Sequence, residues 1–476
     1  SLFEEIATHV EAGRLTPLPS HVYPWADAAD AFHLMSQTKH VGKVVLELVP
    51  ERPCLVTVRC GDRFQQVSET AYTVRAASRD DLDAVLDAIG VDDLQRVVHG
   101  WAFDDATGAD AEERYFTHPF HLAQALQGYG LDRPVQTTVL STDMQRVGME
   151  ERVIPEKSLL LGPVRVVPHE IPELPMRSVD VAWARSAGAR NQQKDALAVE
   201  LWATGDASAD PVVAYRGADR WVSTVRSADI GRSGQSVDLK EGGVYLITGG
   251  TGGIGLELAD HLTARTRSGD QLTVALLSRS GLPARDEWAR VLRERPDTDR
   301  TARAIRKVLL LESRGVTVEL PRADITDPAE VRDALDDLEE RHGPIRGVLH
   351  TAGVVDDALV ALKSNESAAR VLAPKVRGTQ ILGDLLQDQP LDFLVLFSSV
   401  SAVTGLPGQV DYTAANAFLD AYAQQQRALE GRPVTAIGWS AWQEVGMAAE
   451  LADGRPESER EGATHPMFDQ MQQTDA

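Results

Sequence analysis

A glycine-rich turn between a strand and a helix constrains the fold more than any other feature of this sequence. Five residues at 244–248 (VYLIT) predict a buried strand, and a helical pattern follows the turn. Glycine is needed where a chain turns sharply and lets a pyrophosphate approach its backbone, and the helix N-terminus then faces the phosphate charge. The residues that we expect to bind a dinucleotide in this way are Thr248, Gly249, Gly250, Thr251, Gly252, Gly253, Ile254 and Gly255.

Apolar strands alternate with helical segments through the C-terminal half of the chain. Nearly continuous apolar strands between helices are typical of a parallel sheet that is covered on both faces. The sequence therefore predicts an α/β fold with a doubly wound parallel sheet. Its strands are expected at 244–248, 273–279, 316–324, 347–353, 393–400 and 435–442.

The residues at the ends of these strands extend the predicted cofactor site, because ligands lie at the carboxyl ends of parallel strands. The second strand ends in Ser278 and Arg279. A cation at this place suits the 2′-phosphate of NADP, whereas an enzyme that uses NAD usually has an acidic residue there. The other strand-end residues expected beside the dinucleotide are Asp324, Ile325, His350, Thr351, Ala352 and Gly353.

The N-terminal half, residues 51–228, also alternates strands and helices. This order predicts a second, largely parallel sheet. No strand here runs into a glycine-rich turn, so we expect no cofactor in this half. A segment rich in Gly and Ser at 231–243 is typical of a linker. Strands are predicted at 54–60, 95–103 and 135–142, and helices at 79–90 and 120–130.

Four polar residues fit the reduction of a ketone by hydride. An alkoxide develops as hydride arrives, so the reaction needs an acid near the carbonyl oxygen, and a tyrosine serves if a nearby cation stabilises its phenolate. Tyr412 lies thirteen residues beyond Ser399, and Asn416 follows one helical turn later. Asn416 carries no charge, so the cation must come from elsewhere. Lys375, on the preceding predicted helix, is the best candidate.

These motifs resemble a known family. The turn has the form T-G-x-x-x-G-x-G of the short-chain dehydrogenases, whose catalytic lysine stands four residues after the tyrosine. Here Asn416 takes that place, and the candidate lysine, Lys375, lies on the preceding predicted helix. This exchange of lysine and asparagine resembles the ketoreductase domains of polyketide synthases and of animal-type fatty acid synthases. The resemblance to the polyketide family covers residues 51–447. It implies that Tyr412 donates a proton, Lys375 tunes it and binds the ribose, Ser399 binds the carbonyl and Asn416 fixes Lys375.

The resemblance also implies an organisation and an activity. Residues 51–230 would be a truncated, cofactor-free nucleotide-binding fold that braces a catalytic subdomain at 244–450. Residues 231–243 would link the two, and 451–476 would be a further linker or tail. The implied reaction is the NADPH-dependent reduction of the β-keto group of a polyketide intermediate. An acyl carrier protein outside this chain would present the substrate on its phosphopantetheine arm.

The stereochemical outcome is read by the same analogy. B-type members of the family carry Leu-Asp-Asp after the fourth strand, lack a tryptophan eight residues before the tyrosine and often have a proline nearby. The matching residues are Val355, Asp356, Asp357, Thr404 and Pro407, which favour a D-configured hydroxyl although valine replaces the leucine. In the family a lid over the substrate begins at about residue 438. Within it the candidate contacts with the acyl or phosphopantetheine arm are Trp442 and Met447.

Both ends of the chain resemble other domains. Residues 1–50, with helices predicted at 2–13 and 26–35 and a strand at 41–49, resemble the C-terminal end of a medium-chain dehydrogenase of the enoyl reductase type. The nucleotide-binding glycines of that family would lie upstream, so we expect no activity from this stub. Residues 464–470 (THPMFDQ) resemble the opening of a dehydratase-like domain. Enoyl reductases usually follow the structural half, so either the parent has an unusual order or this interpretation of the stub is wrong.

Composition excludes several classes of partner. The net charge of −23 argues against nucleic acid, because phosphate binding needs a basic face. It also makes an acidic carrier protein a poor long-range electrostatic partner. No uninterrupted apolar run of about 18 residues and no secretory signal occur, so we expect a cytoplasmic protein without membrane contact. We expect no metal ion.

Three alternatives to an active polyketide ketoreductase stay open. A redox-silent relative could bind NADPH and only epimerise an α-substituent or serve as a scaffold, although the intact set of Tyr412, Ser399, Lys375 and Asn416 opposes this. A free-standing short-chain dehydrogenase is opposed by Asn416 and by the N-terminal half. A fatty acid synthase origin shares the exchanged lysine and asparagine and is harder to exclude.

Overall fold

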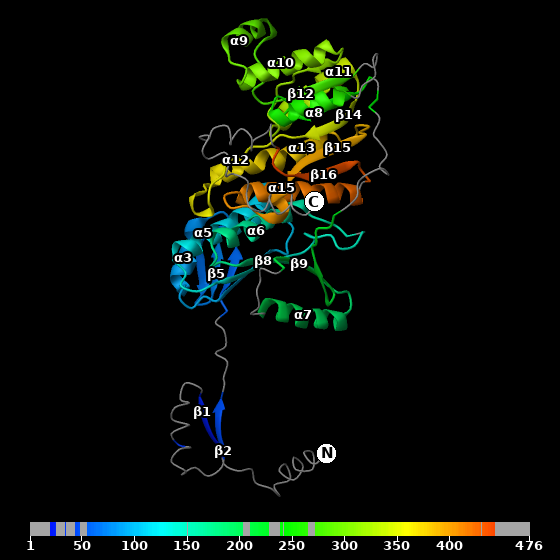
Figure 1. Ribbon diagram of the computed structural model, residues 1–476. Helices are drawn as coiled ribbons and strands as arrows, with labels where there is room; N and C mark the ends of the chain where they lie inside the picture. Colours follow the sequence, from blue (N-terminus) through cyan, green and yellow to red (C-terminus); the bar gives the residue numbers. More distant parts are fainter. Residues whose placement is uncertain are drawn as a thin grey trace. The chain divides into compact units, whose positions relative to one another are not determined.

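The structure is a computed structural model (Figure 1). The residues that it describes are 20–24, 34, 43–47, 55–149, 151–202, 210–227, 239–240, 242–264, 272–429 and 431–442. By their contacts the residues divide into two compact units: Ser1–Arg59 with Gln65–Thr73, and Cys60–Phe64 with Val74–Ala476. None of the described helices has the length and the apolar surface needed to cross a membrane.

The first unit contains a parallel strand pair, β1 (Ser20–Pro24) and β2 (Lys43–Glu47). The strand predicted at 41–49 is β2, whereas β1 was not predicted. The helices predicted at 2–13 and 26–35 lie outside the described residues, apart from the single helical residue at position 34.

A small three-stranded sheet has the order β3-β5-β4. Its strands β4 (Gln65–Ser68) and β5 (Ala71–Val74) are antiparallel and joined by a two-residue turn. The expectation that residues 54–60 begin the parallel sheet of the N-terminal half is wrong. Because β4 and β5 form a local hairpin, β3 (Thr57–Cys60) pairs with that hairpin instead.

The N-terminal half of the second unit is built on a five-stranded sheet of order β10-β9-β8-β7-β6. Its strands are parallel except β10, which is antiparallel to β9, so the predicted largely parallel sheet is confirmed. The helix predicted at 120–130 begins earlier, since helical turns run continuously from residue 108 to 128. The elements are α3 (Arg79–Ile89), β6 (Arg96–Ala102), α4 (Gly108–Glu112), η2 (Glu113–Thr117), α5 (His118–Gly128), β7 (Gln136–Ser141), η3 (Pro155–Leu160), α6 (Leu161–Glu170), β8 (Met176–Ala182), α7 (Ala187–Trp202), β9 (Val212–Arg216) and β10 (Asp219–Val222).

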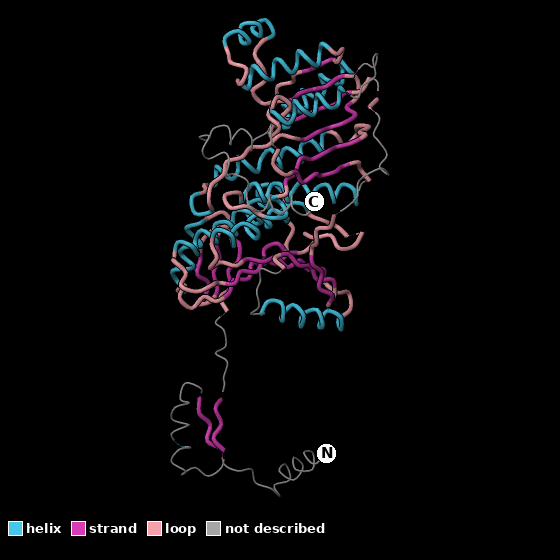
Figure 2. Tube along the Cα trace, viewed as in Figure 1, coloured by secondary structure: helices cyan, strands magenta, loops and turns pink. Residues whose placement is uncertain are grey.

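The C-terminal half is built on a six-stranded, wholly parallel sheet of order β13-β12-β11-β14-β15-β16. This confirms the predicted α/β fold, and Figure 2 shows its alternating helices and strands. The strand predicted at 316–324 is only three residues long. The elements are β11 (Val244–Thr248), α8 (Gly253–Ala264), β12 (Thr273–Leu277), η4 (Arg285–Glu287), α9 (Trp288–Glu294), α10 (Arg300–Ser313), β13 (Thr317–Glu319), α11 (Pro328–His342), β14 (Ile345–His350), η5 (Val360–Leu362), α12 (Asn365–Lys375), α13 (Arg377–Leu385), β15 (Phe393–Ser399), α14 (Ser401–Thr404), α15 (Val410–Leu429) and β16 (Val434–Trp439).

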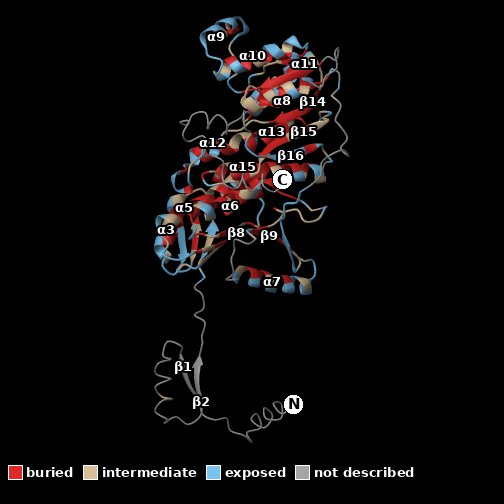
Figure 3. Cartoon of the chain, viewed as in Figure 1, coloured by how far each residue is buried: buried red, intermediate tan, exposed pale blue. Residues whose placement is uncertain are grey.

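In the six-stranded sheet, the C-terminal ends of β11, β12 and β14 lie next to one another. Thr248, the last residue of β11, lies opposite Leu277 of β12 and His350 of β14. All five residues of β11 are buried, and Figure 3 shows the strands of this sheet as largely buried. The polar residues that follow these strands therefore meet at one edge, as expected for a ligand site in a parallel sheet.

The two halves share one hydrophobic core, in which α6 of the N-terminal half packs on α15 of the C-terminal half (Figure 1). The two helices approach closely at Gly162. A Cβ atom there would lie 2.3 Å from the carbonyl oxygen of Val410 and 2.7 Å from Cβ of Ala414. The N-terminal half thus contacts the first turn of α15, the helix that carries Tyr412.

Candidate active site

The glycine-rich turn leads directly from β11 into α8. Gly249 has a φ of +66°, in the left-handed region that favours glycine. A Cβ atom at Gly250 would lie 2.6 Å from Cα of Leu276, and one at Gly255 would lie 2.7 Å from Cα of Gly250. Side chains at these places would force the turn open. A tight turn that ends at the N-terminus of a 12-residue helix fits a pyrophosphate group, because the helix presents free N–H groups and the positive end of its dipole.

A chain of hydrogen bonds joins the ends of β11 and β14. The Thr248 hydroxyl lies 2.7 Å from Nδ1 of His350, and Nε2 of His350 lies 3.2 Å from the carbonyl oxygen of Pro374. Burial lowers the pKa of His350 to about 3, so the ring is neutral. A carbonyl can only accept, so Nε2 carries the proton and Nδ1 accepts from Thr248. This chain fixes the strand ends and the last turn of α12.

The predicted phosphate-binding arginine stands exposed at the end of β12. Arg279 has a second arginine beside it, because Nε of Arg322 donates to the Arg279 carbonyl oxygen at 3.1 Å. Ser278 is buried, and its hydroxyl has no hydrogen-bond partner among the described residues. Two guanidinium groups at this edge fit a 2′-phosphate.

Asp324 and Ile325 follow the short strand β13. One Asp324 carboxylate oxygen accepts from the backbone and hydroxyl of Thr326 at 2.9 and 2.7 Å. Burial raises the pKa of Asp324, but the Thr326 hydrogen bonds and the charges of Arg279 and Arg377 outweigh it and lower the pKa overall. Asp324 is therefore ionised and held by its own turn. Ile325 is buried.

Lys375 lies inside the protein at the end of α12. The residue is 3% exposed, and Nζ donates to the Phe397 carbonyl oxygen at 2.7 Å. The same nitrogen lies 5.7 Å from the centre of the Tyr412 ring. Burial lowers the pKa of Lys375 to about 8, with Asp420 opposing. A Cβ atom at Gly353 would come within 3.1 Å of Cε of Lys375, so this position after β14 must be small.

Tyr412 lies in the first turn of α15, facing the end of β15. Burial raises the pKa of its phenol, and the polar side chains of Asn416 and Ser399 nearby partly oppose this. The phenol therefore holds its proton at neutral pH. A cation that lowers the Tyr412 pKa was expected from the sequence, but in this structure burial has the larger effect. Ser399 itself caps the next turn, because its Oγ accepts from the backbone N–H of Ser401 at 3.2 Å.

Asn416 is fully buried one turn after Tyr412. Its Nδ2 donates to the Tyr412 carbonyl oxygen at 2.8 Å, while Oδ1 has no hydrogen-bond partner among the described residues. The expected contact of Asn416 with Lys375 is not made here, since the amide is turned toward its own helix. An unpaired, fully buried oxygen beside Tyr412 is costly and leaves an acceptor free for a ligand or water.

The predicted stereocontrol residues lie on two loops that the fold joins. The backbone N–H of Ala358 donates to the Gly408 carbonyl oxygen at 3.0 Å. Gln409 also donates to the Asp357 carboxylate at 3.1 Å. The first loop carries Val355, Asp356 and Asp357, and the second carries Pro407 and follows Thr404, the last residue of α14.

Of the two predicted substrate contacts, only Trp442 is described. Its ring packs edge-on against Trp439 with the ring centres 5.2 Å apart, as part of the core beside β16. This favours a packing role. Met447 lies outside the described residues.

A cavity of about 800 Å³ reaches Ser399 and Thr404 from the side of β16 and α15. Neither Tyr412, Lys375 nor the glycine-rich turn lines it. It is therefore not the cofactor cradle.

Three charged residues near the site were not predicted from the sequence. Arg322 could have been found, because it stands two residues before Asp324 at a strand end. Lys363 and Asp411 form a buried ion pair next to Tyr412. No sequence pattern distinguishes a buried charge from a solvated one, and only the fold brings these two positions together.

A doubly wound parallel sheet with this glycine-rich turn, and with a tyrosine, a serine and a buried lysine meeting at its edge, defines an oxidoreductase of the short-chain dehydrogenase type. Residues 243–444 match the KR domain family, and residues 1–46 match the zinc-binding dehydrogenase family. Residues 243–444 are thus similar to a ketoreductase domain of the kind found in polyketide synthases, and residues 1–46 are similar to part of a zinc-binding dehydrogenase.

Known proteins agree with this family. The 6-methylsalicylic acid synthase of Aspergillus terreus is 40% identical over 208 residues, 43% of this chain and 11% of that protein. A phenolphthiocerol/phthiocerol polyketide synthase of Mycobacterium tuberculosis is 31% identical over 357 residues, 73% of this chain and 18% of that protein. A solved structure of an A1-type ketoreductase is 29% identical with a TM-score of 0.64, covering 81% of this chain and 76% of that one. The chain spans 4% to 18% of the length of these and similar curated relatives.

Proposed function

We propose that residues 244–450 form the catalytic subdomain and use NADPH to reduce the β-keto group of an acyl thioester to a hydroxyl. The observation that carries this proposal is the buried Lys375, whose ammonium lies 5.7 Å from the Tyr412 ring at the edge where the glycine-rich turn ends. Residues 51–230 brace this subdomain, and residues 231–243 link the two.

The roles of the polar groups follow from their surroundings. NADPH, when bound, supplies the hydride. Tyr412 holds a proton that it gives to the developing alkoxide, since burial keeps the phenol protonated. Lys375 stabilises the phenolate that is left, because its buried charge has little solvent to screen it. The hydroxyl of Ser399 orients the carbonyl, and Asn416 holds the backbone of Tyr412 through its 2.8 Å hydrogen bond.

The cofactor proposal rests on the strand ends. The residues of the glycine-rich turn would hold the pyrophosphate. Thr351, Ala352 and Gly353 would lie along the dinucleotide, and Asp324 would lie beside the adenine. Arg279, with Arg322 beside it, would bind the 2′-phosphate, so NADPH is preferred to NADH.

The substrate proposal rests on the relatives, which are multidomain polyketide synthases. An acyl carrier protein would present the intermediate on its phosphopantetheine arm, and enoyl reductase and dehydratase domains are the expected neighbours. Asp356 and Asp357, with no tryptophan at position 404, support a B-type product with a D-configured hydroxyl.

The test is the oxidation of NADPH with a β-ketoacyl thioester or trans-1-decalone. We expect turnover with NADPH, little with NADH, and a loss of at least about a hundredfold in Tyr412→Phe, as for an essential general acid. Tyr422→Phe is the matched control, because Tyr422 is buried on the same helix outside the site, and it should keep the wild-type rate. NADPH binding without any turnover would instead support the redox-silent alternative.

A further inference from the structure

Lys363 and Asp411 form an ion pair inside the protein, and Asp411 directly precedes Tyr412 in the chain. Their side chains are 0% and 1% exposed, and Nζ of Lys363 lies 2.7 Å from Oδ2 of Asp411. The two groups are close enough for an ion pair, but their angles do not fit a hydrogen bond, and Oδ2 accepts no hydrogen bond among the described residues. A fully buried pair of this kind needs an explanation, because charges lose their hydration when they are buried.

The pair connects the first turn of α15 to the loop that carries the predicted stereocontrol residues. The other Asp411 oxygen, Oδ1, accepts from the backbone N–H of Tyr412 at 2.8 Å. The Lys363 ammonium also donates to the carbonyl oxygen of Asp356. One ammonium and one carboxylate thus join the backbone of Tyr412 to the backbone of Asp356.

The N-terminal half also hydrogen-bonds to the segment around Lys363 and to the loop before α15. Gln124 of α5 donates to the carbonyl oxygens of Val360 and Lys363 at 2.8 and 3.0 Å. Glu170, the last residue of α6, accepts from the backbone N–H groups of Val360 and Gly408 at 2.6 and 2.7 Å. The loop around Lys363 is therefore fixed at several points, and the ion pair is its connection to Tyr412.

Stability alone does not account for this pair. Replacing a buried ion pair by uncharged residues of similar size often leaves stability unchanged or raises it, whereas removing one partner is costly. We propose that Lys363 and Asp411 are positioning residues that hold Tyr412 in register with the loop of Asp356, and so set both the rate and the stereochemical purity of the reduction. This proposal rests on the proposed reductase function. Neither residue needs to touch the substrate.

The decisive variant is the double substitution Lys363→Met with Asp411→Asn. It removes both charges, keeps an acceptor for the Tyr412 N–H and is close to isosteric. The single variant Lys363→Met leaves a buried carboxylate unpaired and should lower Tm, and the double variant should restore Tm toward that of the wild type. The matched control is Lys157→Met with Asp105→Asn, which removes a second ion pair with a fully buried lysine at 2.9 Å, between η3 and the loop after β6 in the N-terminal half.

We expect the double variant to fold with a Tm near that of the wild type but to lose about tenfold to a hundredfold in kcat, as a small misplacement of a catalytic group does. KM for NADPH should stay unchanged, and the ratio of the two hydroxyl epimers should fall toward one. The control variant should keep the wild-type rate and epimer ratio. If the double variant recovers kcat and epimer ratio along with Tm, the pair is only structural and the proposal is wrong.

Amide hydrogen exchange over residues 405–418 tests the pair without activity. We expect faster exchange there in the double variant than in the control variant at equal Tm, because the first turn of α15 opens more often. Unchanged exchange would overturn the proposal. A wild type that binds NADPH without turnover would refute the proposed function, and the exchange comparison would still decide the role of the pair.

Discussion

The two parallel sheets of the second unit have similar architectures but differ at their carboxyl edges. In the C-terminal half, β11 runs into the glycine-rich turn that we propose as the dinucleotide site. In the N-terminal half, β7 runs into Thr142, Asp143 and Met144, and Asp143 takes a φ of +55° without being a glycine. The same kind of sheet can thus carry a binding edge or a closed one, depending on the side chains that follow its strands.

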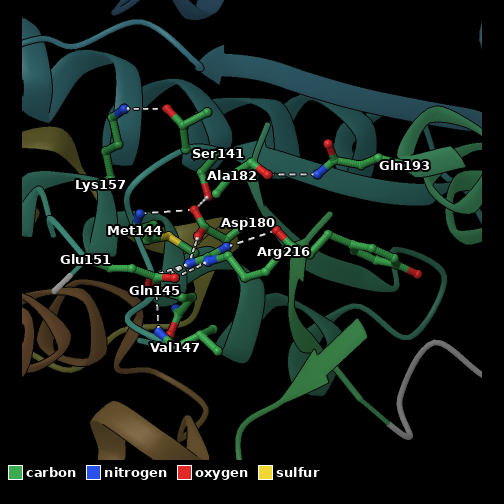
Figure 4. Close-up of polar contacts among 12 residues, drawn as sticks. Ser141, Met144, Gln145, Val147, Glu151, Lys157, Asp180, Ala182, Gln193 and Arg216 are labelled. Carbon is green, nitrogen blue, oxygen red and sulfur yellow. Dashed lines mark hydrogen bonds and ion pairs between the residues drawn. The ribbon is translucent and has the colours of Figure 1, made fainter. Parts of the chain in front are cut away.

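A buried polar network closes the edge of the N-terminal half (Figure 4). Asp180 of β8 is fully buried and accepts from the Ser141 hydroxyl at 2.9 Å, the Met144 N–H at 3.0 Å and Arg216 at 3.1 Å. Arg216, the last residue of β9, also binds Glu151 at 2.9 and 3.0 Å. These side chains occupy the edge where a parallel sheet binds its ligand, which is consistent with our expectation that this half binds no cofactor.

The largest effect is expected when Arg216 is removed, which tests whether the Asp180 network only stabilises the N-terminal half. Burial raises the pKa of Asp180 and the charge of Arg216 opposes it, so Arg216→Met leaves a buried carboxylate without its cation. We expect the free energy of unfolding to fall by about 3 kcal/mol, measured by urea denaturation. NADPH affinity of the folded protein should not change. A large loss of affinity at full folding would show that the closed edge does more than stabilise its half.

The second prediction concerns a side chain added to the glycine-rich turn of the C-terminal half. In Gly250→Ala a Cβ atom would lie 2.6 Å from Cα of Leu276, so the turn must shift and NADPH affinity should fall about a hundredfold in a fluorescence titration. Gly188→Ala is the matched control, because a Cβ atom there has no neighbour within 4 Å, and α7 should be stabilised slightly. Equal affinity in the two variants would contradict the assigned cradle.

The third sharpens the cofactor assignment. Arg279→Ala removes one charged donor from the end of β12, so affinity for NADPH should fall about tenfold or more while affinity for NADH stays the same. The ratio of the two dissociation constants is the measurement. An equal loss for both cofactors would place Arg279 elsewhere than at the 2′-phosphate.

The smallest effect concerns pH. Burial lowers the pKa of Lys375 to about 8, so its ammonium predominates below that pH and the neutral amine above it. Because the reduction needs the cation, kcat/KM should fall about tenfold per pH unit as the pH rises beyond 8. Burial raises the pKa of Tyr412 above its usual value of 10, so loss of the phenol proton cannot cause the fall in kcat/KM near pH 8. In Lys375→Arg the cation persists above pH 8, so the fall in kcat/KM should disappear. If kcat/KM of this variant still falls above pH 8, Lys375 is not its cause.

The sequence predicted the open edge better than the closed one. A glycine-rich turn between an apolar strand and a helix is typical of a dinucleotide-binding fold, so the α/β fold followed from the sequence. The candidate residues, among them Tyr412 and Lys375, could be chosen from the same motifs and stay a prediction. The Asp180 network could not be predicted, because Ser141, Asp180 and Arg216 come from three strands and look like ordinary polar residues. The same holds for Lys363 and Asp411, and for the hairpin that draws β3 away from the parallel sheet.

The most direct measurement is the stoichiometry of NADPH binding to the wild-type chain by isothermal titration calorimetry. The account predicts one NADPH per chain, with strong preference over NADH, because among the described residues we assign a dinucleotide site at the edge of the C-terminal sheet and none at the edge that Asp180 and Arg216 fill. Two molecules per chain would mean that the edge closed by Asp180 and Arg216 also binds a dinucleotide. No binding would contradict the cofactor site that the glycine-rich turn and Arg279 define.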